Sequence, residues 1–456
     1  MRFIQTAAVA ALLGLAITAA PGPASANDLL WDGRFADGTR ASGVPIAGWN
    51  APASQPQLGG KPMFDAANPV RWVVRQGLPA AAAAAQRQPF VELAGGDRLP
   101  GIIEGHTSGL DDWRRTMPPH LFVRPLSAVD LPGKQPRPHV RVASEFVRRI
   151  VLVPRLGQPL PPATLLTRDG REVGFRSLRF TATGVILLGD EGPQRLAFDE
   201  IAEIRLADRD PWEMYARLLA WLVPQAAASP ADAAAARLMA AETDDGLVIT
   251  TAVDPLQGTG DANNARTWHL RAQPAWSLDP LWLPHASVRR RVVFTACEVP
   301  LSLIEPAKVE RKATFGGSWT WQRDRNVHGA ALSAAGLPFG WGFGTQAFSA
   351  LTFPLPPFAT AFRAGAALDA AAGGGGCVKA SVHLGDAFTQ PPPPAAASSA
   401  ADARNAVANG GSGNVSAEKA CVPKPQPKGS PAAASGPPCT LRSRCQVQLP
   451  PNVALR

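Results

Sequence analysis

The sequence is poor in charged residues and lacks the motifs of the common enzyme classes. Only 18% of its 456 residues are charged, whereas 46 prolines and 42 glycines make up about a fifth of the chain, a composition that favours loops and short strands. It has no G-x-S-x-G elbow, H-E-x-x-H pair or phosphate-binding loop. Acidic pairs such as Asp244 and Asp245 lie beside turns, where carboxylates usually act as turn formers. We therefore expect no enzyme, with an unrecognised glycoside hydrolase as the remaining catalytic alternative.

Cysteine is also scarce, and the spacing of the cysteines indicates no disulfide framework. The five cysteines are an odd number, none forms a C-x-x-C pair, and no cluster with histidine has zinc spacing. Cys297 and Cys377 lie in predicted strands, where a buried thiol is expected. The three cysteines of the tail could pair with one another: Cys421, Cys439 and Cys445. No cofactor and no metal site are expected, with a structural calcium ion left as an alternative.

Long apolar runs are confined to the N-terminus. Arg2 supplies a positive charge, Ala7 to Ala20 an apolar stretch, and Ala24-Ser25-Ala26 a cleavage site, which together are typical of a signal peptide. No later segment has about 18 uninterrupted apolar residues, so no transmembrane helix is expected. The mature chain is predicted to begin at Asn27, after cleavage behind Ala26, and to be secreted or held in the periplasm and cell envelope.

An excess of basic residues gives the chain a formal charge of +9. Such a surface could serve phosphate, anionic glycans or a negatively charged envelope. Aromatic residues do not interleave with the basic ones and no nucleic-acid motif is recognised, so we expect no nucleic-acid partner. The densest basic run, Arg289-Arg290-Arg291, is interpreted as a solvated strand end and not as an anion site.

About two hundred residues of the chain resemble one β unit written three times. The middle copy has five short strands, with tight turns at Asp169-Gly170 and Glu191-Gly192. An earlier copy ends with Val142 to Leu152, whose apolar positions align with those of Leu196 to Leu206, and a looser third copy follows. Short strands at this spacing predict small, strongly bent barrels of Sm-like or SH3-like type.

The segments around the repeats are predicted to form both strands and helices. Asp28 to Arg75 predicts a hairpin that turns at Asp37-Gly38. One helix is predicted to begin at the capping residue Asp210 and to bury an apolar stripe, and another to cover Ala233 to Ala241. The aromatic stretch around Trp276 either lines a ligand surface or is buried between domains.

Near the C-terminus, Phe339 to Leu384 contains three period-two runs separated by glycine and proline, which predicts strands of a half-buried sheet. Three motifs stand in this stretch: GFGTQAFS at 342–349, FRAGAALD at 362–369 and GCVKASV at 376–382. The three motifs resemble those of the NPCBM family, carbohydrate-binding modules from bacterial secreted proteins, and they occur in the family's order. The resemblance covers Gly316 to Leu384. Gln346 stands where the family has histidine, and the family's second half, with its returning strands, is not recognised.

This resemblance implies a β-sandwich of jelly-roll, galactose-binding-like type that recognises glycans of galactose type. Sugar binding needs an aromatic platform and a few fixed polar groups. The residues of the right kinds in this segment are Trp319, Trp321, Trp341, Gln346, Arg363 and Asp369. Core packing is the alternative role of each tryptophan, and turn formation that of Asp369.

We therefore expect a mainly β chain of small barrels, a sandwich module, a few short helices and a tail. The expected segments are a signal peptide (1–26), an N-terminal β segment with a linker (27–87), three barrel repeats (88–160, 161–241 with helices, and 242–313), an incomplete NPCBM-like module (314–386) and a disordered tail rich in proline, alanine, glycine and serine (387–456). The predicted function is non-catalytic binding of a polysaccharide or glycoconjugate. The alternative is an envelope scaffold whose barrels bind envelope proteins.

Overall fold

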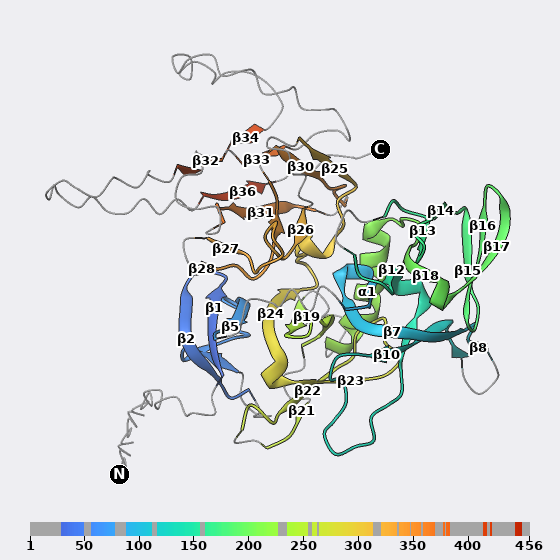
Figure 1. The fold of residues 1–456 in the computed structure, drawn as a ribbon. Helices are drawn as coiled ribbons and strands as arrows, with labels where there is room; N and C mark the ends of the chain where they lie inside the picture. The colour runs from blue at the N-terminus through green and yellow to red at the C-terminus, as the bar shows by residue number, and fades with distance from the viewer. Residues whose placement is uncertain are drawn as a thin grey trace, which may run out of the picture.

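The fold is mainly β, as predicted, with one α-helix among the residues that the structure describes (Figure 1). The computed structural model describes residues 29–49, 56–77, 88–111, 116–155, 160–226, 235–253, 258–261, 264–312, 321–334, 337–346, 348–356, 359–369, 377–378, 380–383, 414–416, 420–421 and 443–448. The predicted signal peptide lies outside these ranges. Within them, no helix is long and apolar enough to cross a membrane.

Four units of similar connectivity, hereafter the platform, contribute strands to one large antiparallel sheet. The first unit has β1 (Leu30–Phe35), β2 (Arg40–Ala47), β3 (Gln57–Leu58), β4 (Lys61–Pro62) and β5 (Val70–Arg75). The second has β6 (Phe90–Leu93), β7 (Arg98–Thr107), β8 (Leu110–Asp111), β9 (Thr116–Met117), β10 (His120–Pro125), β11 (Val140–Ala143) and β12 (Val147–Val151). The third has β13 (Thr164–Thr167), β14 (Glu172–Gly174), β15 (Ser177–Phe180), β16 (Gly184–Gly189), β17 (Gly192–Ala197) and β18 (Ile201–Arg205). The fourth has β19 (Arg237–Thr243), β20 (Val248–Ala252), β21 (Gly258–Thr259), β22 (His269–Ala272), β23 (Leu281–Pro284) and β24 (Val288–Thr295).

In every unit the first strand pairs antiparallel with the last: β1 with β5, β6 with β12, β13 with β18, and β19 with β24. The turn after each first strand is closed by the same hydrogen bond, from a backbone N–H to the carbonyl four residues on. Its four copies measure 2.8–3.0 Å and join Phe35 to Thr39, Leu93 to Asp97, Thr167 to Arg171, and Thr243 to Leu247. The sequence predicted three copies of this unit, and the N-terminal hairpin at Asp37-Gly38 begins a fourth.

The units are joined through equivalent strands. Last strands pair between the second and third units (β12 with β18) and between the fourth and first (β24 with β5). Second strands meet between the second and fourth units, where Arg98 of β7 pairs with Val248 of β20. One hydrophobic core runs through all four units and encloses Trp31 and Trp276 completely. Trp276 is therefore buried between units, the second of its two predicted roles.

The helix α1 (Pro211–Ala226) packs against the turn at Ala94–Gly96 and against β19 and β20. Asp210 caps it as predicted, because its carboxylate accepts hydrogen bonds from the backbone N–H groups of Trp212 (2.8 Å) and Glu213 (3.4 Å). The predicted apolar stripe is also found on its inner face, where the buried residues are Met214, Tyr215, Leu218 and Leu222.

Three local predictions are wrong. Within the predicted helix Ala233 to Ala241, the residues from Arg237 on belong to the strand β19, because pairing with β20 and β24 overrides the helix propensity of the alanines. Cys297 is exposed and not a buried thiol. Arg289 and Arg291 are only 8% exposed, so their run is not a solvated strand end.

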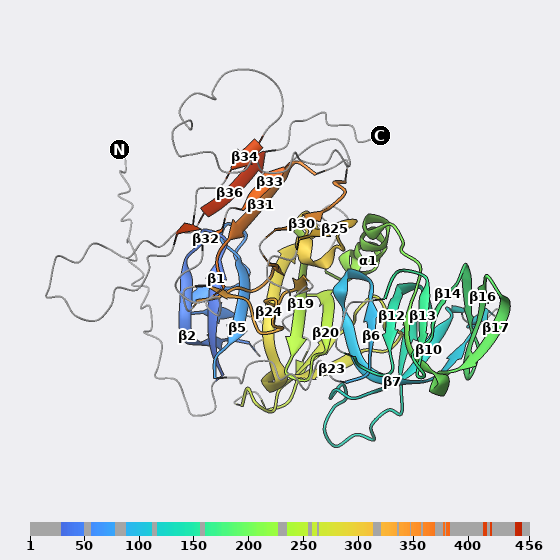
Figure 2. The same ribbon diagram turned by 45° about the horizontal axis from the view of Figure 1, so that its top comes forward.

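The C-terminal module forms short paired strands on one side of the platform, with β25 and β30 next to α1 in both views (Figure 2). Its ladders are β25 (Lys308–Arg311) with β30 (Ser349–Thr352), β26 (Gln322–Arg323) with β29 (Phe343–Gly344), and β27 (Ser333–Ala334) with β28 (Leu337–Pro338). The remaining module strands are β31 (Ala361–Ala366), β32 (Cys377–Val378) and β33 (Ser381–His383).

Most of the tail that was predicted to be disordered lies outside the described residues. Within it the structure describes β34 (Asn414–Ser416), β35 (Ala420–Cys421) and β36 (Ser443–Gln448), which pair antiparallel with β33, β32 and β31. The tail thus supplies three module strands with partners, and the β32–β35 ladder sets Cys377 opposite Cys421.

A buried carboxylate closes the junction between the second and fourth units. Asp97 is fully buried and accepts hydrogen bonds from the backbone N–H of Thr250 (2.8 Å), the Thr250 hydroxyl (2.8 Å) and the indole N–H of Trp276 (2.7 Å). Burial raises the pKa of Asp97 to about 6, although these hydrogen bonds act to lower it.

We predict that Asp97→Ala lowers the free energy of unfolding by roughly 3–5 kcal/mol, because it leaves three buried donors without an acceptor. Asp169→Ala is the matched control, since Asp169 lies in the equivalent turn of the third unit but is exposed, and should change stability little. Denaturant unfolding measures both. Equal losses in the two variants would contradict the role assigned to Asp97.

The raised pKa of Asp97 also predicts a pH dependence. The folded protein binds this proton more tightly than the unfolded chain, where the pKa of an aspartate is about 4. The group therefore stabilises the fold fully below pH 4, and this contribution is lost as the pH rises through about 6. The unfolding free energy of the wild type minus that of Asp97→Asn should fall by about 3 kcal/mol between about pH 4 and pH 7. A difference that does not change with pH would contradict this.

Candidate functional site

Three aromatic rings of the module form a half-buried group. Trp321 meets Phe343 edge to face, with ring centroids 5.8 Å apart, and Phe343 lies 5.4 Å from Phe353. The β26–β29 ladder holds this group in place, since it pairs Arg323 with Phe343. Each of the three rings therefore keeps part of its surface accessible.

Trp341 has different surroundings, because its turn packs on the platform. The Trp341 ring is half-buried and packs against the common hydrophobic core. The preceding Gly340 lies against Trp72 of β5, where a Cβ atom would overlap the indole ring, so only glycine fits there. The carbonyl of Gly340 also accepts a hydrogen bond from Arg290. This glycine-flanked turn therefore attaches the module to the first and fourth units.

The polar candidates lie farther along the chain. Gln346 follows β29 and is half-buried, Arg363 on β31 is exposed, and Asp369, just after β31, is half-buried. Trp319 lies outside the described residues. The five described candidates are therefore divided between the surroundings of the β26–β29 ladder and those of β31, and Trp321 and Trp341 have different neighbours.

Four charged residues, hereafter the docking network, fasten the module to the fourth unit. Glu242 of β19, whose side chain is 5% exposed, forms ion pairs with Arg290 of β24 (2.9 Å) and with Arg325 of the module. Arg290 also pairs with Asp324 of the module (3.1 Å). Asp324 in turn accepts a hydrogen bond from the backbone N–H of Gly342 (2.9 Å), which links the network to the Trp341 turn.

The docking network is ionised because its charges compensate one another. Burial alone would raise the pKa of Glu242, but the charges of Arg290, Arg325 and Arg289 lower it overall. Burial likewise opposes the charge on Arg290, yet Asp324 and Glu242 raise its pKa. Removal of either partner would leave a charge in a site with little solvent, which is the costly case for a buried ion pair.

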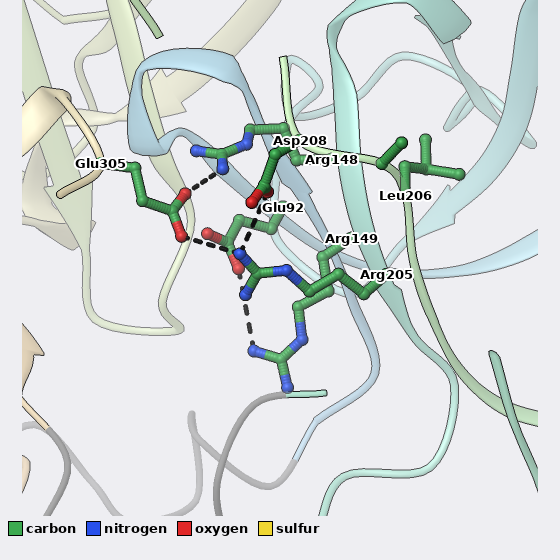
Figure 3. Close-up of a pocket in the computed structure, with 8 residues that line it drawn as sticks. Glu92, Arg148, Arg149, Arg205, Leu206, Asp208 and Glu305 are labelled. Carbon is green, nitrogen blue, oxygen red and sulfur yellow. Dashed lines mark hydrogen bonds and ion pairs between the residues drawn. The ribbon is translucent and has the colours of Figure 1, made fainter. Parts of the chain in front are cut away.

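A small charged pocket lies at a second contact of the module, between the second and third units (Figure 3). Its arginines point toward carboxylates: Arg148 pairs with Glu305, and Arg205 with Glu305 (3.0 Å) and Asp208 (3.4 Å). Arg149 pairs with Glu92 (3.8 Å) and with Glu203 outside the pocket (2.7 Å). Because every positive charge is matched, the pocket serves as an interface and offers little to an anion. In the described part of the chain, no group of histidine, cysteine, aspartate and glutamate could hold a metal ion.

Sequence reasoning missed the docking network entirely. Arg290 stood in a run interpreted as solvated, and Glu242, Asp324 and Arg325 belong to no motif. The available signal was that Arg289-Arg290-Arg291 continues directly into the apolar Val292, Val293 and Phe294, since charges inside a core-forming strand need buried partners.

Residues 300–395 match the NPCBM/NEW2 domain family. The predicted resemblance is thereby confirmed, and the matched span begins earlier than the predicted 314, so that it includes Glu305 and its pairs with the platform. No curated protein and no solved structure matches the chain. The chain therefore carries an NPCBM/NEW2 domain whose inner side is attached to the four-unit platform.

We predict that Glu242→Ala destabilises the folded protein by roughly 3–5 kcal/mol, because it leaves Arg290 and Arg325, whose side chains are only 11% and 19% exposed, without their shared partner. The control is Glu213→Ala on α1, which removes an ion pair to Arg217 whose side chains are 60% and 50% exposed and should change stability little. Chemical unfolding compares the two variants. A loss no larger for Glu242→Ala than for Glu213→Ala would show that the docking network contributes nothing.

Proposed function

On the premise of the NPCBM/NEW2 domain at residues 300–395, we propose that this chain is an exported, non-catalytic carbohydrate-binding protein. The domain match supports the proposal most directly, because the family is one of carbohydrate-binding modules. The ligand would be a polysaccharide or glycoconjugate, of galactose type by the family resemblance. The signal-peptide pattern from Arg2 to Ala26 supports secretion or retention in the periplasm and cell envelope.

We further infer the fold type of the units and of the module. We propose that the four units are small barrels of Sm-like or SH3-like type, because the first strand of each unit pairs with its last strand. The module is taken as a β-sandwich of galactose-binding-like type, whose strands β31, β32 and β33 find partners in the tail. The platform would hold the module at a fixed orientation.

Within the module, the half-buried Trp321 is the tryptophan that we assign to the sugar, with Gln346, Arg363 and Asp369 as polar groups. An aromatic ring covers the apolar face of a pyranose, and fixed polar groups bind its hydroxyls. Trp341 would act indirectly, since its ring packs on the platform core.

A second candidate function is that of an envelope scaffold without sugar binding. It is favoured by the attachment of Gly340 and Trp341, which lead into the family's signature turn at 342–349, to the platform. Under this alternative the mature protein retains an envelope protein and binds no glycan.

The proposal predicts that the mature protein binds at least one polysaccharide or glycan on an array. Arg363→Ala and Asp369→Ala should each weaken this binding about tenfold, the loss typical of a charge-assisted hydrogen bond. Arg176→Ala is the control, because Arg176 is 76% exposed and lies in the third unit. Absence of binding to any glycan by the folded wild type would rule out the proposed function, and equal binding by all variants would rule out these residues.

A further inference from the structure

One aromatic side chain of the module is turned to solvent and held in a strained backbone conformation. Phe348 is 61% exposed, more than any other exposed large hydrophobic residue among those the structure describes. Its φ is +58°, in the left-handed region that a bulky L-residue adopts rarely and at a cost in energy. Such strained positions concentrate at binding and active sites. The fold thus tolerates both an exposed apolar ring and strain at one residue of the family's signature turn.

The chain that continues from β25 is hydrogen-bonded to this residue. The β25–β30 ladder pairs Arg311 with Ser349, and one position further the backbone N–H of Lys312 donates to the carbonyl of Phe348 (3.0 Å). The backbones of Lys312 and Phe348 are therefore joined just beyond the end of the ladder. Lys312 is exposed, and no carboxylate of the described residues lies within ion-pair distance of its ammonium group.

The charge next to Phe348 is positive. Lys308 and Glu310 form an ion pair of 2.7 Å on β25, whereas the exposed Lys312 adds a positive charge at the end of this strand. The strained, exposed Phe348 and the charged Lys312 therefore lie at the same end of the β25–β30 ladder, although they belong to different segments of the chain.

We propose that Phe348 and Lys312 also contact the ligand, in addition to the residues assigned above, and that they select an acidic glycan, one that carries uronic acid units. This inference rests on the proposed carbohydrate-binding function and adds the ligand class and the contact residues to it. The Phe348 ring stacks on the apolar face of a sugar ring, and the Lys312 ammonium group pairs with the sugar carboxylate. The backbone of Phe348 is strained and its ring is exposed to solvent, so the ring is accessible to a ligand.

The test measures binding of the mature full-length protein to polygalacturonate, to neutral galactan and to dextran sulfate, by affinity electrophoresis. The wild type should bind polygalacturonate more tightly than galactan. Phe348→Gly should weaken that binding about tenfold while its melting temperature stays the same or rises, because glycine adopts positive φ without strain. Phe348→Tyr, which keeps the ring, should retain binding. Lys312→Gln should weaken binding to polygalacturonate a few-fold and leave binding to galactan unchanged.

Trp221→Ala is the matched control, since Trp221 is an exposed aromatic residue (48%) on α1 and does not belong to the module. Unchanged binding in Phe348→Gly, with glycan binding intact in the wild type, overturns this inference and leaves the proposed function standing. Preference for galactan overturns the acidic specificity. Equal affinity for dextran sulfate and polygalacturonate, unaffected by Phe348→Gly, shows charge attraction alone and also overturns it. No binding to any of the three by the wild type, together with an empty glycan array, overturns the proposed function itself.

Discussion

The arrangement of this protein depends on the carboxylate of Glu242. It lies in the first strand of the fourth unit and pairs with one arginine of its own unit and one of the C-terminal module. A buried charge of this kind is tolerated only while its partners are in place. Through Arg290 and Asp324 the same charges reach the backbone of the Trp341 turn. The module is therefore fixed by directional contacts that specify one orientation, which apolar packing alone would define less sharply.

This constraint divides the module into an inner and an outer side. The inner side uses Gly340, Trp341 and the docking network, and a second contact uses Glu305 and the carbonyl of Pro354, which accepts a hydrogen bond from the Trp212 indole (2.6 Å). The residues left accessible are those of the β25–β30 ladder end, the Trp321 group and β31. A module attached in this way presents a fixed surface, so that under the proposed function a glycan need not order the module when it binds.

The sequence allowed the broad class to be predicted, along with several details of local chemistry. Alternating apolar residues predicted the β fold, Asp210 predicted the start of α1, and three ordered motifs pointed to the NPCBM domain that residues 300–395 match. The alternation, the helix cap and the motifs each depend on residues that are close together in the sequence, so they can be recognised from the sequence alone. The first unit was not predicted as a repeat because its middle strands, β3 and β4, have only two residues each and show no alternation in the sequence. The strand β19 was mistaken for a helix because its alanines favour a helix unless two partner strands are supplied.

The docking network could not be predicted for a related reason. Glu242 and Arg325 are 83 positions apart, and nothing in the sequence around either of them specifies the other. Long-range charge pairs depend on how whole units stack, which is decided by strand pairings such as β24 with β5. The same limit applied to Trp341, whose glycine-rich surroundings suit a ligand loop and an intramolecular contact equally well.

The most direct measurement is amide hydrogen exchange of the mature protein with and without saturating polysaccharide. The account predicts slower exchange on ligand addition at 308–312 and 348–352, with no change in β15–β17 at the far end of the platform. Slower exchange confined to the platform, or no change anywhere with a polysaccharide that binds, would contradict the division of the module into a docked side and a ligand side.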